Sequence, residues 1–137
     1  MLMLLSVTVL GVWADGASTF GGGDGSAKNP YIINTAAHWD QFASDVNGGN
    51  AYSDKYFLLD ADITVSTMVG TGTTVNNAKS FSGTFDGGGY TLTFNYNGSG
   101  DDIAPFRFLK NALISNLHVA GQITTSGRHA GGLAGRT

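Results

Sequence analysis

The stretch FSGTFDGGGYTLTFNYNG, residues Phe81 to Gly98, decides the predicted fold. A tight turn is expected at its centre, where aspartate can bond back to its own turn and glycine accepts positive φ without strain. The turn residues are Asp86, Gly87, Gly88 and Gly89. After them apolar and polar residues alternate, which is typical of a half-buried strand. Tyr90, Leu92, Phe94 and Tyr96 share one face of that strand.

Composition extends this prediction to the whole chain. Its 137 residues suit one domain, and 42% of them are hydrophobic while only 12% are charged. All acidic residues are aspartate, and Thr, Gly, Asn and Asp favour strands and turns over helices. The chain is therefore predicted to be all-β. A formal charge of −3 argues against nucleic-acid binding, and the lack of cysteine excludes disulfides and thiolate metal sites.

The first fourteen residues, MLMLLSVTVLGVWA, form an apolar run that ends in a small residue, with Val12 and Ala14 at the positions that a signal peptidase favours. The run is too short to span a bilayer as a helix, which needs about 20 residues. We interpret residues 1–14 as the apolar region and cleavage site of a signal peptide, cut after Ala14. A buried N-terminal strand is the alternative. Residues 15–29 are predicted to be a glycine-rich leader with little to bury, and the protein is expected to be secreted or on the cell surface.

One amphipathic helix is predicted after a short strand at Tyr31 to Asn34. Thr35 is its expected N-cap, and Gly48 and Gly49 are expected to end it. Helical spacing places four apolar residues on one stripe, namely Trp39, Phe42, Ala43 and Val46. In a chain of strands we expect this helix to cap the end of the strand stack.

Further strands are predicted at Lys55 to Leu59 and around Ile63 to Val65, with alternation again near Phe106 and Leu117. Aligning the segments places Phe106 opposite Leu133, 27 residues later, and Leu92 opposite Leu117, 25 residues later. Offsets of this size predict stacked coils of parallel strands. The expected inward residues are Phe85, Leu92, Phe94, Phe106, Leu117, Val119, Ile123 and Leu133.

Several motifs, in their order along the chain, resemble bacterial surface proteins with GLUG-motif repeats. They are NPYIINTAAHWDQFASDVNGG, KYFLLDADI, FSGTFDGGGYTL, ALISNLHVAGQI and GGLAG, the last with Gly131, Gly132, Leu133 and Gly135. The resemblance covers about Asn29 to Gly135 and implies a right-handed parallel β-helix of the kind carried by secreted adhesins and some surface peptidases. It departs at APFRF and in having a single GGLAG. Residues 30–137 are thus expected to be the capped N-terminal coils of a longer β-helix.

No chemistry is predicted from the side chains. His38, His118 and His129 lack the spacing of metal ligands, and no nucleophile motif occurs. The pair Asp101 and Asp102 is interpreted as a solvated loop, and His129 as a loop histidine. We therefore expect no catalytic, cofactor or metal site in this chain.

The function predicted is that of a non-enzymatic, exported cell-surface module with an adhesin-like binding or scaffold role. Two alternatives stay open: an N-terminal accessory part of a secreted carbohydrate-active enzyme or peptidase, and a structural spacer. Sugars would stack on exposed aromatic rings, for which Tyr52, Tyr90 and Tyr96 are the candidates. Expected partners are a host glycan, a protein ligand or further coils of the same chain, with no nucleic acid. Membrane association is expected only through export or an anchor outside this sequence.

Overall fold

A computed structural model of the chain describes residues 19–137. The predicted signal peptide at residues 1–14 lies outside the described residues, as do residues 15–18 of the predicted leader. The described elements are β1 (Tyr31–Ile33), α3 (Ala36–Asn47), β2 (Tyr56–Leu59), β3 (Ile63–Val65), β4 (Thr84–Asp86), β5 (Thr91–Gly98), β6 (Phe106–Phe108), β7 (Leu113–Ser115), β8 (His118–Thr125) and β9 (Ala134–Arg136).

The predicted helix is confirmed as α3. Thr35 caps it, because its hydroxyl accepts a hydrogen bond from the His38 N–H at 3.1 Å. Gly49, at φ +112°, ends it in the left-handed region that favours glycine, and its N–H donates to the Val46 carbonyl at 3.0 Å. The buried residues of α3 are those of the predicted stripe, Trp39, Phe42, Ala43 and Val46.

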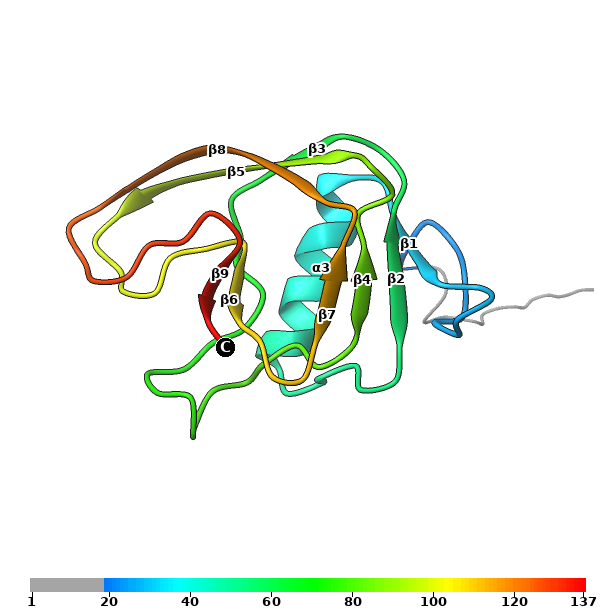
Figure 1. The fold of residues 1–137 in the computed structure, drawn as a ribbon, viewed down its shortest axis with the longest axis horizontal. Coiled ribbons are helices and arrows are strands. Elements are labelled where there is room, and N and C mark those ends of the chain that lie inside the picture. Colours follow the sequence, from blue (N-terminus) through cyan, green and yellow to red (C-terminus); the bar gives the residue numbers. More distant parts are fainter. Residues whose placement is uncertain (1–18) are drawn as a thin grey trace, which may run out of the picture.

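The strands form three small sheets, with orders β1-β2-β4-β7, β3-β5-β8 and β6-β9. Within these sheets, neighbouring strands run parallel to each other. Figure 1 shows the first sheet on one side of α3, β6 and β9 on the other, and β3, β5 and β8 across one end of the helix. Most strands have three or four residues, whereas β5 and β8 have eight each and extend beyond the rest of the molecule (Figure 1).

The predicted fold class, a right-handed parallel β-helix with α3 as a terminal cap, is contradicted. The structure has short parallel strands in three small sheets of unequal size around one helix. The side chains of α3 reach into the space between these sheets, where Trp39 packs against Phe85 of β4 and Phe106 of β6 with ring centroids 6.0 and 5.3 Å apart. Alternation along a strand predicts which face is buried, but it does not determine how strands group into sheets.

The predicted register is also corrected. Leu92 pairs with Val119 and Phe106 with Ala134, in place of Leu117 and Leu133. A shift of one residue turns a side chain to the other face of a strand. Leu133 is accordingly 40% exposed, and its predicted inward position is wrong.

The rest of the predicted inward set contributes to the core to different degrees. Phe85, Leu92, Phe94 and Phe106 are buried, while Leu117 and Ile123 are partly buried against the core and Val119 is half-buried. Around α3 the core is largely aromatic, with the rings of Phe42 and Phe57 only 4.5 Å apart at their centroids. Packed aromatic pairs add about 0.5–1.5 kcal/mol each beyond the area they bury.

Residues 19–29, expected to bury little, pack onto β1 and β2. Phe20 is 6% exposed and lies against the rings of Tyr31 and Phe57. The N–H of Gly21 donates to the Ile32 carbonyl at 2.8 Å, so backbone bonds hold this segment beside β1. No helix within residues 19–137 is both long and apolar enough to cross a membrane.

Candidate functional site

Of the three tyrosines predicted to bind at the surface, Tyr52 is held within the molecule. Its hydroxyl donates to Oδ2 of Asp45 at 2.6 Å, and its ring packs on that of Phe57 with centroids 4.9 Å apart. Burial, and then the hydrogen bond to Asp45, raise the pKa of Tyr52 above its ordinary value. A half-buried ring with an occupied hydroxyl has little face left for a sugar.

Tyr90 and Tyr96 lie at opposite ends of β5. Tyr90 precedes the strand and is 37% exposed. Tyr96 is half-buried against the core, and its hydroxyl accepts a hydrogen bond from the Gly100 N–H at 3.3 Å. The structure therefore leaves Tyr90 accessible and uses the Tyr96 ring mainly to support the strand.

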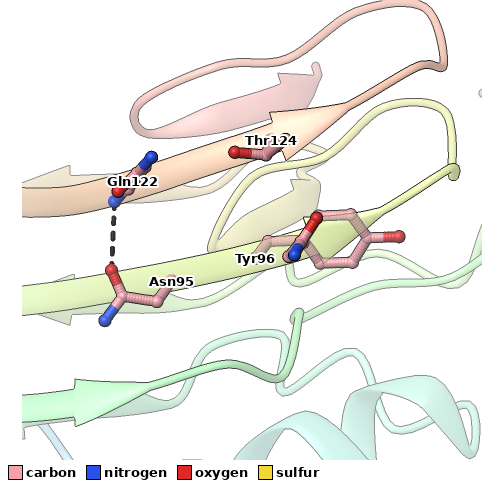
Figure 2. A pocket seen from close by; sticks show the side chains of 5 residues that line it. Asn95, Tyr96, Gln122 and Thr124 are labelled. Carbon is pink, nitrogen blue, oxygen red and sulfur yellow. Dashed lines mark hydrogen bonds between the residues drawn. The ribbon is translucent and has the colours of Figure 1, made fainter.

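The outer face of β5 and β8 carries a shallow polar hollow, shown in Figure 2. Parallel pairing sets Asn95 beside Gln122 and Asn97 beside Thr124, and all four side chains are exposed. Together with Tyr96 they line a volume of about 310 Å³. We call these four residues, Asn95, Asn97, Gln122 and Thr124, the amide face.

The backbone orients one of these side chains. Oδ1 of Asn95 accepts a hydrogen bond from the Gln122 N–H at 3.1 Å (Figure 2), which leaves the Asn95 amide nitrogen free to donate outward. Amides and hydroxyls both donate and accept hydrogen bonds, and none of the lining residues is charged. Such a surface suits a neutral ligand rich in hydroxyl groups.

The predicted turn at Asp86 is present, and the Asp86 side chain links it to the segment between β7 and β8. Oδ1 of Asp86 accepts from the Gly88 N–H at 2.9 Å and from Nδ2 of Asn116 at 3.1 Å. Gly88 and Gly89 have φ of +59° and +78°, as a tight turn of this kind requires. At Gly87 an added Cβ would lie 2.5 Å from the Asn116 carbonyl oxygen, so this turn sits directly against the chain that precedes β8.

The glycines of GGLAG differ from one another. An added Cβ would lie 2.2 Å from the Ala134 carbonyl oxygen at Gly131 and 2.7 Å from the Asp102 carbonyl oxygen at Gly135, whereas none of the described atoms lies within 4 Å at Gly132. Two of these three glycines are thus needed for close backbone approach, and Gly132 is not.

A cluster that the sequence analysis missed surrounds Asp102. Its carboxylate was expected to be solvated, but Asp102 is 2% exposed. Oδ1 of Asp102 accepts from Nε of Arg136 at 2.9 Å and lies 2.8 Å from Nδ1 of His129. Beside it, Arg128 pairs with Asp101 at 2.9 Å in a more exposed position.

Electrostatics in this cluster favour the ionised carboxylate. Burial alone would raise the pKa of Asp102, but the hydrogen bonds and charges of Arg136 and His129 lower it below the ordinary value of 3.8. The signal in the sequence is a spacing: Asp101 and Asp102 lie 27 residues before Arg128 and His129. The same offset pairs Asn95 with Gln122 across β5 and β8.

An aspartate that contacts a histidine can orient the imidazole for catalysis when a nucleophile is beside it. No serine or threonine hydroxyl among residues 19–137 hydrogen-bonds the ring of His129, whose other partner is Nη2 of Arg136 at 3.4 Å. The part of the chain that the structure describes also holds no group of three or more His, Asp, Glu or Cys suited to a metal. What the cluster does is join the segment after β5 to the last strand.

Comparison with known proteins gives one informative match. The chain is 35% identical to a protein of Evansella cellulosilytica named "Putative Gly-rich membrane protein". The alignment covers 80% of this chain but 13% of that protein, so the chain spans a small part of its relative's length. No protein-family profile matches the chain. No solved structure matches it either.

Proposed function

We propose that this chain is a non-enzymatic module of a cell-envelope protein and that its amide face binds a neutral polysaccharide at the cell surface. The name of the relative as a Gly-rich membrane protein supports a place in the envelope. The resemblance of several motifs to GLUG-repeat surface proteins supports export and an adhesin-like role. The observation that carries the binding proposal is the amide face itself.

The geometry of the amide face suits a chain of sugars better than a small compact ligand. The hollow is shallow and lies along two extended strands, so successive sugar units can each meet a side-chain pair. Strand residues on one face repeat every ~6.6 Å, so the side-chain pairs form a row along the strands. Because the lining is uncharged, binding should change little with salt.

The test titrates the full chain with neutral hexasaccharides of glucose, xylose, mannose and N-acetylglucosamine. The amide NMR shifts of residues 19–137 report where each one binds. At least one should perturb residues 95–97 and 122–124. Asn97→Ala and Thr124→Ala, both at exposed positions, should each weaken binding about tenfold, or about 1.4 kcal/mol. Ser44→Ala, on the exposed side of α3, is the matched control and should bind as the wild type does.

Two results would contradict the proposal. If no hexasaccharide perturbs the amide face, a binding role at this surface is wrong and a spacer role is favoured. If binding occurs but Asn97→Ala and Thr124→Ala leave it unchanged, the sugar binds elsewhere on the chain.

A further inference from the structure

A second hollow lies near the C-terminal end of α3, away from β5 and β8, between the loop that joins β3 to β4 and the segment that joins β6 to β7. Figure 1 shows this loop projecting from the body near the C-terminus. Two adjoining hollows of about 610 and 280 Å³ share Val75, Asn76, Ser80, Lys110 and Asn111. We call the combined hollow the lysine cleft, because Lys79 and Lys110 both line the larger part.

Within residues 19–137, direct ion pairs do not neutralise the two lysines of the lysine cleft. Neither Lys79 nor Lys110 forms an ion pair with a carboxylate of the described residues. Among the side chains that line the cleft, one carries a carboxylate, that of Asp54. In a chain with a formal charge of −3, two lysines and one aspartate among the lining side chains make this cleft a locally positive site.

The backbone of both lysines is fixed by hydrogen bonds. Lys79 exchanges two with Thr71, its N–H donating at 2.7 Å and its carbonyl accepting at 3.0 Å. The Lys110 N–H donates to the Phe81 carbonyl at 3.0 Å. Oδ1 of Asn77 accepts from the N–H groups of Thr73 and Thr74 at 3.2 and 3.0 Å, which closes the tip of the loop. Two lysines on a fixed backbone lose less entropy on binding than two on a mobile loop.

The remaining lining indicates the class of anion. Hydroxyls and amides, from Ser80, Ser82, Asn76 and Asn111, suit the hydroxyl groups of a sugar, and Val75, 51% exposed, offers an apolar surface to a sugar ring. No arginine fork lines the cleft, so an anion there meets no bidentate partner among the lining residues. Lysine ammonium groups act as point charges, and a sugar carboxylate is the anion that also brings hydroxyl groups to the neighbouring amides.

We propose that the lysine cleft binds an acidic saccharide, a glycan whose sugar units carry carboxylates. Lys79 and Lys110 contact the carboxylate, and the amides and hydroxyls contact neighbouring hydroxyl groups. Asp54 and the C-terminal end of α3, which reaches the cleft at Gly49, both repel an anion. Binding therefore depends on both lysines, and it does not rest on the proposed function of the amide face.

The experiment titrates the full chain with a hexuronic acid tetrasaccharide, a neutral hexose tetrasaccharide and inorganic phosphate, by calorimetry and NMR. The acidic tetrasaccharide should perturb residues 76–82 and 108–111, and its affinity should fall as salt rises. Lys79→Gln and Lys110→Gln should each weaken it at least about tenfold, or about 1.4 kcal/mol. Lys28→Gln, at an exposed position that does not line the cleft, should leave it unchanged.

Four results would overturn the proposal: no binding of the acidic tetrasaccharide, equal binding of the neutral one at the cleft, stronger binding of phosphate there, or an equal loss in Lys28→Gln. Unchanged amide shifts away from residue 79 or 110 show that each variant remains folded. Asn97→Ala should keep the acidic tetrasaccharide bound, so failure at the cleft and failure at the amide face are separately visible.

Discussion

Asp102 and Arg136 are 34 residues apart in the sequence, yet Nε of Arg136 donates to Oδ1 of Asp102 at 2.9 Å. This contact joins the loop after β5 to the last strand, and His129 contacts the same oxygen. Replacing the Asp102 carboxylate by a neutral amide leaves the Arg136 guanidinium without its anion. The position of the Asp102 side chain is almost inaccessible to water. We predict that Asp102→Asn lowers the free energy of unfolding by about 2 kcal/mol near neutral pH. Urea denaturation measures this, and a change below about 0.5 kcal/mol would show that the cluster is not structural.

The same cluster predicts a dependence on pH. Because the folded-state pKa of Asp102 is lowered, its contribution is fully present above the ordinary value of 3.8 and is lost as the pH falls through the lowered pKa. The difference in unfolding free energy between wild type and Asp102→Asn should therefore shrink as the pH falls below about 4. Comparing urea midpoints across this range tests it; a difference that grows in acid has the wrong sign.

The aromatic core around α3 makes a prediction about packing. Trp39 is fully buried, and its Nε1–H donates to the Thr67 carbonyl at 3.0 Å. Trp39→Ala should destabilise the chain by about 3–5 kcal/mol, because the cavity lies between α3, β4 and β6. Ser44→Ala on the exposed side of the same helix should stay within about 0.5 kcal/mol of wild type. Equal effects in the two variants would mean that Trp39 is not at the centre of the core.

Two glycines of the predicted motifs give a matched pair. In Gly87→Ala the new methyl group would meet the backbone of Asn116 and Leu117 at 2.5 Å, which should cost about 1–3 kcal/mol. In Gly132→Ala it would meet none of the described atoms within 4 Å, so stability should change little. Thermal unfolding of both variants checks this. A larger loss in Gly132→Ala would contradict the described turn after β4.

Hydrogen exchange should report where the strands lie in their sheets. β7, β8 and β9 each stand at the end of a sheet order, so each pairs with one neighbour, whereas β2, β4 and β5 pair with two. In β7, β8 and β9, the N–H groups that point away from the paired strand should exchange fastest. The N–H groups of β4 and α3 should exchange slowest. Uniform protection through β9 would require a further partner for these edges.

The sequence predicted best those features that depend on residues close together along the chain. The stripe of α3, its Thr35 cap and the Asp86 turn all depend on residues within a few positions of each other, and all three are present. The register was misjudged because Leu92 and Leu117 were matched by residue type, whereas the structure pairs Phe94 with Gly121, at φ +120°. An added Cβ there would lie 2.0 Å from the Phe94 carbonyl oxygen, a constraint that alternation does not reveal.

The candidate sites depend on contacts that no local pattern encodes. Burial of Asp102 requires Arg136, and the amide face requires the offset of 27 residues between Asn95 and Gln122. Tyr52 was expected at the surface because it lies in a loop, but Asp45, one turn from the end of α3, holds its hydroxyl. Grouping of the strands into three sheets around a helix likewise follows from long-range packing of aromatic side chains.

The register of β5 against β8 places the amide face, and a pair of introduced cysteines measures it directly. The chain has no cysteine, so any disulfide reports the introduced pair. Asn97 and Thr124 are register partners on adjacent strands, at a spacing that a disulfide can bridge. Asn97→Cys with Thr124→Cys should cross-link readily under mild oxidation, and Asn97→Cys with Gln122→Cys should not. Faster cross-linking of the second pair would shift β8 by two residues and contradict the amide face.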